Sequence, residues 1–262
     1  MSTLKQPPSP VRLYLDAPLS EGGEAALDEA QAHYLKNVMR RGAGDAVCVF
    51  NARDGEFEGA IEALSKKSAV IRLQKKIRAP EPEPDLWLIF AAVKRGAVDM
   101  IAEKATELGV AALMPVTTER TNAARVNEAR LAAIAREAAE QCGRLSVPRV
   151  DPLAPLAKVL DAWPQDRRLI FCDEAGDDRQ AEWGGRQGRA APMLEALGED
   201  AQTKWAILIG PEGGFSPAER LRLRESDFVT PMTLGPRILR ADTAAISAIA
   251  LWQAARGDFR RR

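Results

Sequence analysis

The first third of the chain mostly alternates hydrophobic and polar residues with a period of two. The alternation runs through four short segments, at residues 11–15, 46–50, 56–64 and 68–74. A period of two places successive side chains on opposite faces of a strand, so each segment predicts a half-buried β-strand. The middle pair is joined by a turn that carries Asp54 and Gly55, which favours a hairpin. The pattern predicts a small antiparallel β domain.

One helix is expected inside this β domain, from a cap at Asp28 to about residue 41. Its hydrophobic residues fall at helical spacing, at Ala32, Leu35, Val38 and Met39. After the last strand, residues 77–85 read IRAPEPEPD, with three prolines among charged residues. Such a stretch is typical of a stiff connector, so we predict a first domain over residues 1–78 and a second over residues 79–262.

Beyond this connector, short apolar strands alternate with longer helical segments. Strands are expected at residues 86–92, 111–116, 168–172, 205–209 and 232–234, and helices at 98–108 and 127–142. Wholly apolar strands separated by helices predict a parallel sheet that is covered on both faces, an α/β domain. The polar, glycine-rich stretch at 176–192 is predicted to be a flexible surface loop.

The stretch LIGPEGGFSPAE, residues 208–219, follows one of these strands. Its glycines are Gly210, Gly213 and Gly214, and its helix-start residues are Ser216, Pro217 and Glu219. Glycine lets a backbone approach a ligand closely or adopt positive φ, and a serine cap with proline and glutamate predicts a helix N-terminus whose free N–H groups can face a ligand. A tight strand-to-helix turn without a ligand is the alternative interpretation. The stretch matches neither a P-loop nor a GxGxxG fingerprint.

A second loop, LGPRILRADTAA at residues 234–245, follows the next strand and leads into a helix expected from about 243 to 255. In open parallel sheets ligands bind beyond the carboxyl ends of the strands, so both loops are candidate sites. Arg237, Arg240 and Asp242 lie where the helix begins, although a helix N-terminus disfavours cations. Another partner is therefore expected for the arginines, unless Arg240 pairs with Asp242 and Arg237 faces solvent.

The last helix is apolar nearly all round, with Ile246, Ile249, Leu251 and Trp252 pointing in several directions. Such a helix must be covered on more than one side, in the core or at a subunit interface. A homodimer would provide that cover.

Three further features have a structural and a functional interpretation. Glu140 and Arg144 are spaced as a surface i, i+4 pair, and Gly143 between them favours a helix end. Cys142 could be a nucleophile, but the sole histidine, His33, lies in the β domain and cannot activate it. Residues 66–78 carry six basic residues and no acid, which fits either a stripe for phosphates or an edge strand protected by lysines.

Composition narrows the class of protein. The chain of 262 residues is 46% hydrophobic and 28% charged, enough to bury a core, and its 37 basic residues balance 37 acidic ones. Any contact with nucleic acid must therefore be local. Three distant cysteines argue against a disulfide framework or a structural zinc site. Without a signal-like or membrane-spanning apolar run, a cytosolic protein is expected.

Together, LIGPEGGFS, LGPRILRADTA, EQCGR and TELGV resemble the RsmE family of SPOUT methyltransferases. The resemblance covers nearly the whole chain, since RLYL, HYLKNVMRRGAGD and FNARDGEFEGAI are similar to the family's PUA-like β domain. It implies methylation of N3 of a uridine in 16S ribosomal RNA, with S-adenosylmethionine as cofactor and no metal. It also implies an α/β fold in which a trefoil-knotted parallel sheet domain follows a smaller PUA-like antiparallel β-barrel, and a homodimer.

Carried over by motif, the resemblance places the cofactor against the glycine loops. These cofactor-binding residues are Ile209, Gly210, Pro211, Glu212, Gly213, Gly214, Leu234, Gly235, Ile238, Leu239 and Arg240, and the strand end FCDEAG adds contacts. The chain departs from the family at Asp242, where a glutamate is common.

The expected catalytic residues are Arg237, Arg240, Asp242 and Glu212. An arginine would stabilise charge on the uracil oxygens while a carboxylate takes the N3 proton or orients the base. The expected RNA-binding residues are Arg40, Arg41, Lys66, Lys67, Arg72, Lys94 and Arg144. The expected substrate is an assembled or late-assembling small ribosomal subunit. The alternatives are a related methyltransferase acting on transfer RNA or a ribose 2′-hydroxyl, and a non-catalytic factor that binds ribosomal RNA.

Overall fold

The computed structural model describes residues 11–121, 125–173, 189–197 and 203–260. The chain separates into two compact units, each considered by itself. The first unit is Met1–Pro82 together with Ala139–Ser146, and the second is Glu83–Ala138 together with Val147–Arg262. Most of the loop predicted at residues 176–192 lies outside the described residues. The predicted domain boundary after residue 78 remains our proposal.

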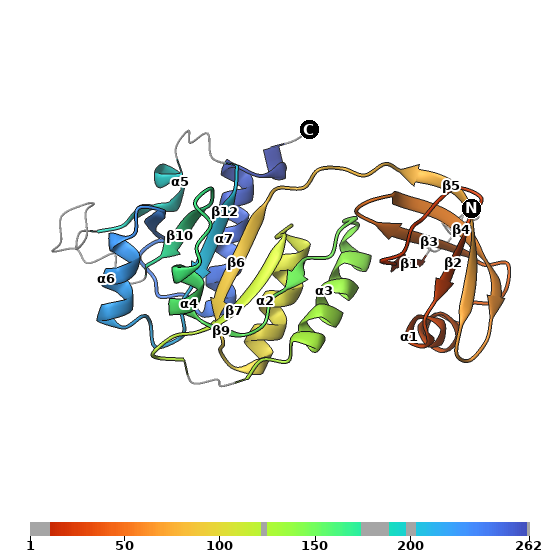
Figure 1. Cartoon of the computed structure of the whole chain (residues 1–262), viewed down its shortest axis with the longest axis horizontal. Helices are drawn as coiled ribbons and strands as arrows, with labels where there is room; N and C mark the ends of the chain where they lie inside the picture. The colour runs from red at the N-terminus through yellow and green to blue at the C-terminus, as the bar shows by residue number, and fades with distance from the viewer. Residues whose placement is uncertain (1–10, 122–124, 174–188, 198–202, 261–262) are drawn as a thin grey trace, which may run out of the picture. The chain divides into compact units, whose positions relative to one another are not determined.

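The first unit is built on a five-stranded sheet in the order β1-β3-β4-β5-β2 (Figure 1). Its strands are β1 (Val11–Tyr14), β2 (Glu24–Leu27), β3 (Ala46–Asn51), β4 (Gly55–Leu64) and β5 (Ala69–Arg78). The β3–β4 and β4–β5 pairs are antiparallel, as predicted. The strand β2, which the sequence pattern did not predict, also pairs antiparallel with β5. The prediction is wrong for β1, which runs parallel to β3. The long connection from β1 to β3, which contains β2 and a helix, permits this parallel pairing.

The helix of the first unit is shorter than predicted. Asp28 caps α1 (Glu29–His33), accepting a hydrogen bond from Gln31 N at 2.8 Å. A single π-helical turn, Tyr34–Val38, continues it, and Arg40 then takes a left-handed backbone conformation with φ of 53°. The wider π turn changes the register of the apolar face. Accordingly Leu35 is buried, whereas Val38 is 59% exposed.

The predicted hairpin between β3 and β4 is confirmed, and its turn requires glycine. Gly55 has φ of 95°, and a Cβ there would lie 2.2 Å from the carbonyl oxygen of Arg78. Asp54 accepts hydrogen bonds from Leu19 N and from Arg53, and these bonds lower the pKa of Asp54 to about 2. The turn is therefore tied to the segment at Leu19.

Residues 139–146 join the first unit through the guanidinium groups of two arginines. Arg12 donates to the carbonyl oxygens of Ala139, Glu140 and Arg144, at 3.1, 3.0 and 3.1 Å. Arg12 also pairs with buried Glu56 at 2.6 Å, and Arg78 links Glu56 to the carbonyl oxygen of Gly143. Gly143, with φ of 84°, ends the helix as predicted. Arg12 thus satisfies two of the terminal carbonyl groups of the helix, those of Ala139 and Glu140.

The second unit contains an eight-stranded sheet in which every pairing between the described strands is parallel. The order is β11-β13-β10-β12-β6-β7-β8, with β9 also beside β7. The strands are β6 (Leu86–Ala91), β7 (Ala112–Thr117), β8 (Arg149–Val150), β9 (Ala154–Pro155), β10 (Arg168–Cys172), β11 (Ala191–Pro192), β12 (Trp205–Ile209) and β13 (Val229–Thr233). The predicted parallel sheet is confirmed. Three two-residue strands were missed because so short a segment has no periodicity.

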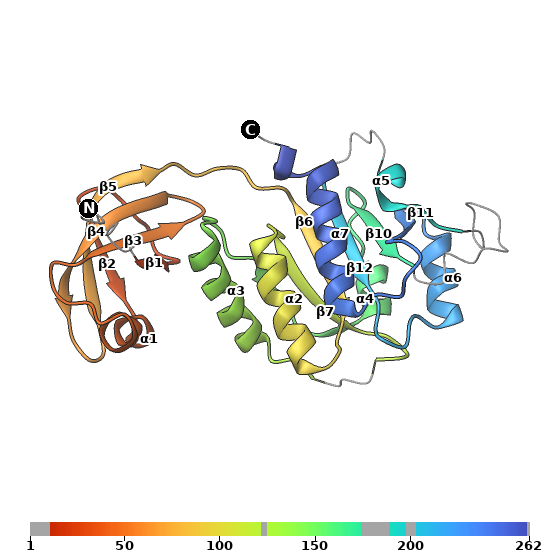
Figure 2. The ribbon, with the colours of Figure 1, turned by 180° about the vertical axis from the view of Figure 1, so that it is seen from behind.

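Helices cover both faces of this sheet, as predicted. They are α2 (Arg95–Glu107), α3 (Glu128–Cys142), α4 (Leu156–Asp161), α5 (Met193–Ala196), α6 (Pro217–Glu225), α7 (Ala241–Ala255) and the 3-10 turn Asp258–Arg260. Figure 2 shows α2 and α7 side by side over one face, where they pack on alternate residues of β6 and β12 such as Leu88 and Ile207. The intervening residues, such as Ile89 and Leu208, face α4 and α6.

Within the described ranges, no helix has both the length and the hydrophobicity needed to cross a membrane. The most hydrophobic long helix of the second unit, α7, is instead packed against other helices. Trp252 and Ala245 of α7 are buried, and α7 contacts both α2 and α5. Part of the apolar surface of α7 is therefore covered by its own unit.

Candidate functional site

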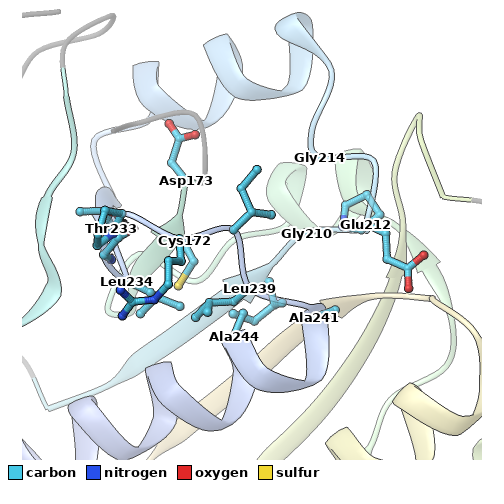
Figure 3. Close-up of a pocket in the computed structure, with 16 residues that line it drawn as sticks. Cys172, Asp173, Gly210, Glu212, Gly214, Thr233, Leu234, Leu239, Ala241 and Ala244 are labelled. Atoms are coloured by element: carbon cyan, nitrogen blue, oxygen red, sulfur yellow. Dashed lines mark hydrogen bonds between the residues drawn. The ribbon is translucent and has the colours of Figure 1, made fainter. Parts of the chain in front are cut away.

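The loops that follow β10, β12 and β13 enclose one pocket, which we call the main pocket (Figure 3). It has a volume of about 220 Å³ and lies at the carboxyl ends of three strands that are adjacent in the sheet. The lining residues are Cys172, Asp173, Ile209, Gly210, Pro211, Glu212, Gly214, Thr233, Leu234, Gly235, Pro236, Arg237, Ile238, Leu239, Ala241 and Ala244. Two loops selected from the sequence thus meet in space, as expected for a site of this sheet class.

Glycines allow the loop after β12 to fold tightly. A Cβ on Gly210 would lie 2.6 Å from the ring of Phe215, which is buried and packs edge-on against Phe171. Gly214 has φ of 67° and donates its N–H to the carbonyl oxygen of Pro211 at 2.9 Å. A larger residue at Gly210 would displace Phe215 from the core beneath the pocket.

The predicted helix start after this loop is confirmed. Ser216 caps α6 by accepting from Glu219 N at 3.1 Å, and the Glu219 carboxylate accepts from Ser216 N at 2.9 Å. The second oxygen of Glu219 accepts from the backbone N–H of Glu119 at 2.9 Å. Glu219 therefore joins the loop after β7 to the loop after β12, a role that the local capping pattern does not reveal.

We expect Glu219→Ala to lower the free energy of unfolding by about 2–4 kcal/mol, because two backbone N–H groups lose a charged acceptor. Ser216→Ala is the matched control, since it removes a cap without disturbing Glu119 and should cost about 1 kcal/mol. Urea unfolding of both variants measures the difference. Equal losses would show that the bond to Glu119 contributes nothing.

The loop after β13 is shaped by Thr233 and Gly235. Thr233 Oγ1 accepts from Gly235 N at 3.2 Å, and Gly235 has φ of 108°, in the region that favours glycine. Ile238 follows with 88% of its surface exposed. Arg240 precedes the first residue of α7 and makes no capping hydrogen bond through its side chain. Asp242 accepts from Thr243 N at 2.7 Å, so its carboxylate stabilises the first turn of α7.

Asp173 is a buried carboxylate at the edge of the main pocket. It is 1% exposed and forms ion pairs with Arg220 at 2.9 Å and Arg224 at 2.8 Å, both on α6. In Figure 3 its carboxylate points towards the helix beyond the glycine loop, away from Leu239 and Ala244. Asp173 thereby fixes the end of β10 to α6. Of the FCDEAG stretch, Cys172 and Asp173 line the pocket, and residues from 174 lie outside the described part.

Most of the residues carried over as cofactor contacts lie together. Of that set, Gly213 and Arg240 do not line the main pocket. Among the expected catalytic residues, Arg237 and Glu212 line it, whereas Arg240 and Asp242 do not. Thr233, Pro236, Ala241 and Ala244 were not singled out from the sequence. Their position at a strand end and in the first turn of a helix is the signal that indicates them.

The basic residues expected to bind RNA have different surroundings. Arg72 of β5 is ion-paired with Glu24 and Glu62, so glutamates on neighbouring strands balance part of the basic stretch. Lys66 and Lys67 lie exposed in the turn between β4 and β5, and Arg40 is exposed after the π-helical turn. Arg41 is half-buried, Arg144 donates to Ser146 Oγ at 2.7 Å, and Lys94 lies at the start of α2.

The chemistry of the main pocket suits a mixed ligand. The two glycine loops supply polar backbone groups, while Leu239, Ala241 and Ala244 supply an apolar side. Such a lining fits a ligand that carries both an apolar ring and hydrogen-bonding groups. Among the described residues, no group of three or more histidines, cysteines or carboxylates is arranged to hold a metal ion.

Comparison with known proteins identifies the family. A family model described as an RNA methyltransferase domain matches residues 80–253, and one described as an RNA methyltransferase PUA domain matches residues 27–74. The chain belongs to this RNA methyltransferase family. The first match covers the whole parallel sheet and nearly all of α7, so this RNA methyltransferase has the main pocket inside its family domain.

Relatives extend the comparison to almost the full chain. The ribosomal RNA small subunit methyltransferase E of Rickettsia conorii is 28% identical over 91% of this chain and 93% of its own. The enzyme of the same name from Bacillus subtilis is 28% identical over 88% of this chain and 90% of its own. These relatives confirm the resemblance to the RsmE family.

Solved structures agree with the fold of this RNA methyltransferase. The small subunit methyltransferase E of Neisseria gonorrhoeae, solved with S-adenosylmethionine, has a TM-score of 0.78 at 26% identity and covers 95% of this chain and 99% of its own. A Legionella pneumophila protein, solved in complex with the same cofactor, has a TM-score of 0.77 at 28% identity and covers 95% and 99%. The expected α/β fold with a PUA domain is confirmed.

Proposed function

We propose that this chain uses S-adenosylmethionine to methylate N3 of a uridine in 16S ribosomal RNA of the small ribosomal subunit. The observation that carries the proposal is the closure of one pocket by the two glycine loops of an RNA methyltransferase domain. The proposal extends to the trefoil knot and homodimer that the resemblance implies, and to a cytosolic location, where small subunits assemble. Relatives named for small-subunit RNA methylation, and two solved with the cofactor, support it.

Residues of the main pocket would hold the cofactor mainly through the backbone of its two glycine loops. Ile209, Gly210, Leu234 and Gly235 line the pocket, and its apolar side would accommodate an adenine ring. When bound, S-adenosylmethionine supplies an electrophilic methyl group on a positively charged sulfur. The chain has to exclude water around this group and hold the acceptor in line with it.

Transfer to uridine N3 requires loss of the N3 proton as the new N–C bond forms and the S–C bond breaks. Arg237, which lines the pocket and is exposed, would stabilise negative charge on the uracil oxygens. The proton would pass to Glu212, which lines the same pocket. Arg240 and Asp242 do not line the pocket but lie next to it, at the start of α7. Any contact that they make with the acceptor would come from that position.

RNA binding outside the pocket is proposed for the remaining basic residues. Lys66 and Lys67, in an exposed turn, and Arg40, beside the π-helical turn, are open to phosphates. Arg41 and Arg144 are proposed to assist, and Arg72 would have to exchange a glutamate partner for a phosphate. The balanced net charge favours a folded ribosomal surface over free RNA as the recognised partner.

Two measurements test the proposal. Isothermal titration with S-adenosylmethionine should give saturable heat, and small subunits from a deletion strain should lack one base methylation that the purified protein restores, as read by mass spectrometry of 16S RNA. No heat at near-millimolar cofactor would favour the non-catalytic RNA-binding factor. A different outcome would favour the related methyltransferase that acts on transfer RNA or on a ribose 2′-hydroxyl. In that case the protein binds the cofactor and the 16S RNA of the deletion strain keeps all its base methylations, but a methylation is missing from its transfer RNA or from a ribose.

A further inference from the structure

A second hollow, which we call the side pocket, lies on the other side of the glycine loop after β12. It has a volume of about 140 Å³ and shares Pro211 and Glu212 with the main pocket. Its other walls follow β6 and β7, which are the next strands after β12 in the sheet order β10-β12-β6-β7. The two pockets are therefore neighbours at the same edge of one sheet, separated by a single loop.

Charged groups converge on the side pocket from three loops. Lys94 and Arg120, both exposed, line it together with the carboxylate-bearing Glu212. In Figure 3 the Glu212 carboxylate points away from Thr233, Leu234 and Leu239 of the main pocket. Over the ranges that the structure describes, no ion pair occupies Lys94 or Glu212. Val93 and buried Pro211 add an apolar wall, so the pocket offers two cations, one carboxylate and an apolar surface.

The loop that carries Arg120 is held firmly against the glycine loop. Arg120 donates to the carbonyl oxygen of Gly213 at 3.1 Å, and Glu119 N donates to Glu219 at 2.9 Å. Glu119 and Arg120 lie in a turn in which Thr121 N donates a hydrogen bond to the carbonyl oxygen of Thr118 at 3.1 Å. A guanidinium with one of its nitrogens tied to Gly213 still has donors for a further anion. Arg120 is thus positioned as part of a site.

We propose that the side pocket binds the acceptor nucleotide of the RNA. Lys94 and Arg120 bind its phosphate, the base lies along Val93 and Pro211, and Glu212 meets the polar edge of the base. Rotation of the base about the shared Pro211–Glu212 wall brings it to the methyl donor in the main pocket. This inference rests on the proposed function and deepens it, because it assigns to Glu212, of the two candidate carboxylates, the contact with the acceptor.

The test combines a binding measurement with kinetics. Uridine 5′-monophosphate is titrated into full-length protein saturated with S-adenosylhomocysteine, and methylation of undermethylated small subunits is followed for Lys94→Ala, Arg120→Ala and the double variant. We expect each single change to weaken nucleotide binding and to raise KM for the subunits about ten- to hundredfold. The Kd for S-adenosylmethionine should stay within about twofold, because neither side chain lines the main pocket.

Arg95→Ala is the matched control, since Arg95 is an exposed cation adjacent to Lys94 that does not line the side pocket. It should leave both readouts unchanged. Wild-type KM and nucleotide affinity in the double variant would overturn the side-pocket assignment while leaving the proposed function intact. Nucleotide binding that depends on Lys94 and Arg120, in a wild-type protein that methylates no RNA, would instead support the pocket and defeat the proposed function.

Discussion

Replacement of Arg237 by alanine is expected to lower kcat for RNA methylation by roughly 10²–10³-fold. Arg237 is an exposed cation on the lining of the main pocket, and the proposed mechanism uses it only when charge develops on the uracil oxygens. The loss should therefore appear in kcat more than in the Kd for S-adenosylmethionine, which calorimetry should find within a few-fold of wild type. Single-turnover assays on undermethylated small subunits measure the chemical step directly.

Two further variants define the role of Arg237. Arg237→Lys keeps the charge but loses the planar fork of donors, so it should recover only part of the lost rate. Arg130→Ala removes an exposed arginine that pairs with Asp99 away from both pockets, and it should retain the wild-type rate. A kcat for Arg237→Ala within about threefold of wild type would contradict the assignment of charge stabilisation to Arg237.

Replacement of Asp173 by alanine is expected to lower the free energy of unfolding by about 3–5 kcal/mol. The side chains of Asp173 and Arg224 are 1% and 2% exposed, so removal of the carboxylate breaks an ion pair that is buried on both sides. Arg220 contributes less because its side chain is 30% exposed. Affinity for S-adenosylmethionine should fall as well, since the end of β10 forms one wall of the main pocket.

Asp161→Ala provides the comparison for Asp173→Ala. Asp161 also pairs with an arginine of α6, Arg222, but these two side chains are 68% and 41% exposed. Its loss should cost less than about 1 kcal/mol. Urea unfolding of the two variants side by side distinguishes the buried pair from the exposed one. Similar losses for both variants would mean that burial of the Asp173 cluster adds no energetic penalty.

The elements that were predicted well from the sequence are those with a local signal. The alternating residues of β4, the apolar runs of β3 and β12 and the capping box at Ser216 each occupy one short stretch of chain. The π-helical turn after α1 was missed because it has the same composition as an α-helix. The parallel pairing of β1 was missed because strand direction depends on how the chain returns between strands.

The candidate site was predictable in outline and not in its contacts. The two glycine loops stood out through residue type and position at strand ends, and they do share one pocket. The ion pairs of Asp173 reach residues 47 and 51 positions away, and the bond from Glu119 to Glu219 spans 100 positions. Periodicity within one sequence carries no information about such partners. The side pocket was missed for the same reason, because it depends on which strands are neighbours.

The contacts of Arg12 bear on the order in which the protein is made. The carbonyl oxygens that Arg12 binds belong to residues 139–144, which leave the ribosome after β6, α2 and β7 of the second unit. The first unit can therefore complete its fold only after part of the second unit has been synthesised. Domains usually fold one after another during synthesis, whereas here the folding of the two units overlaps in time. A fragment cut at residue 82 would expose Arg12 and Glu56 to water, and an isolated β unit would need residues 139–146 grafted back onto it.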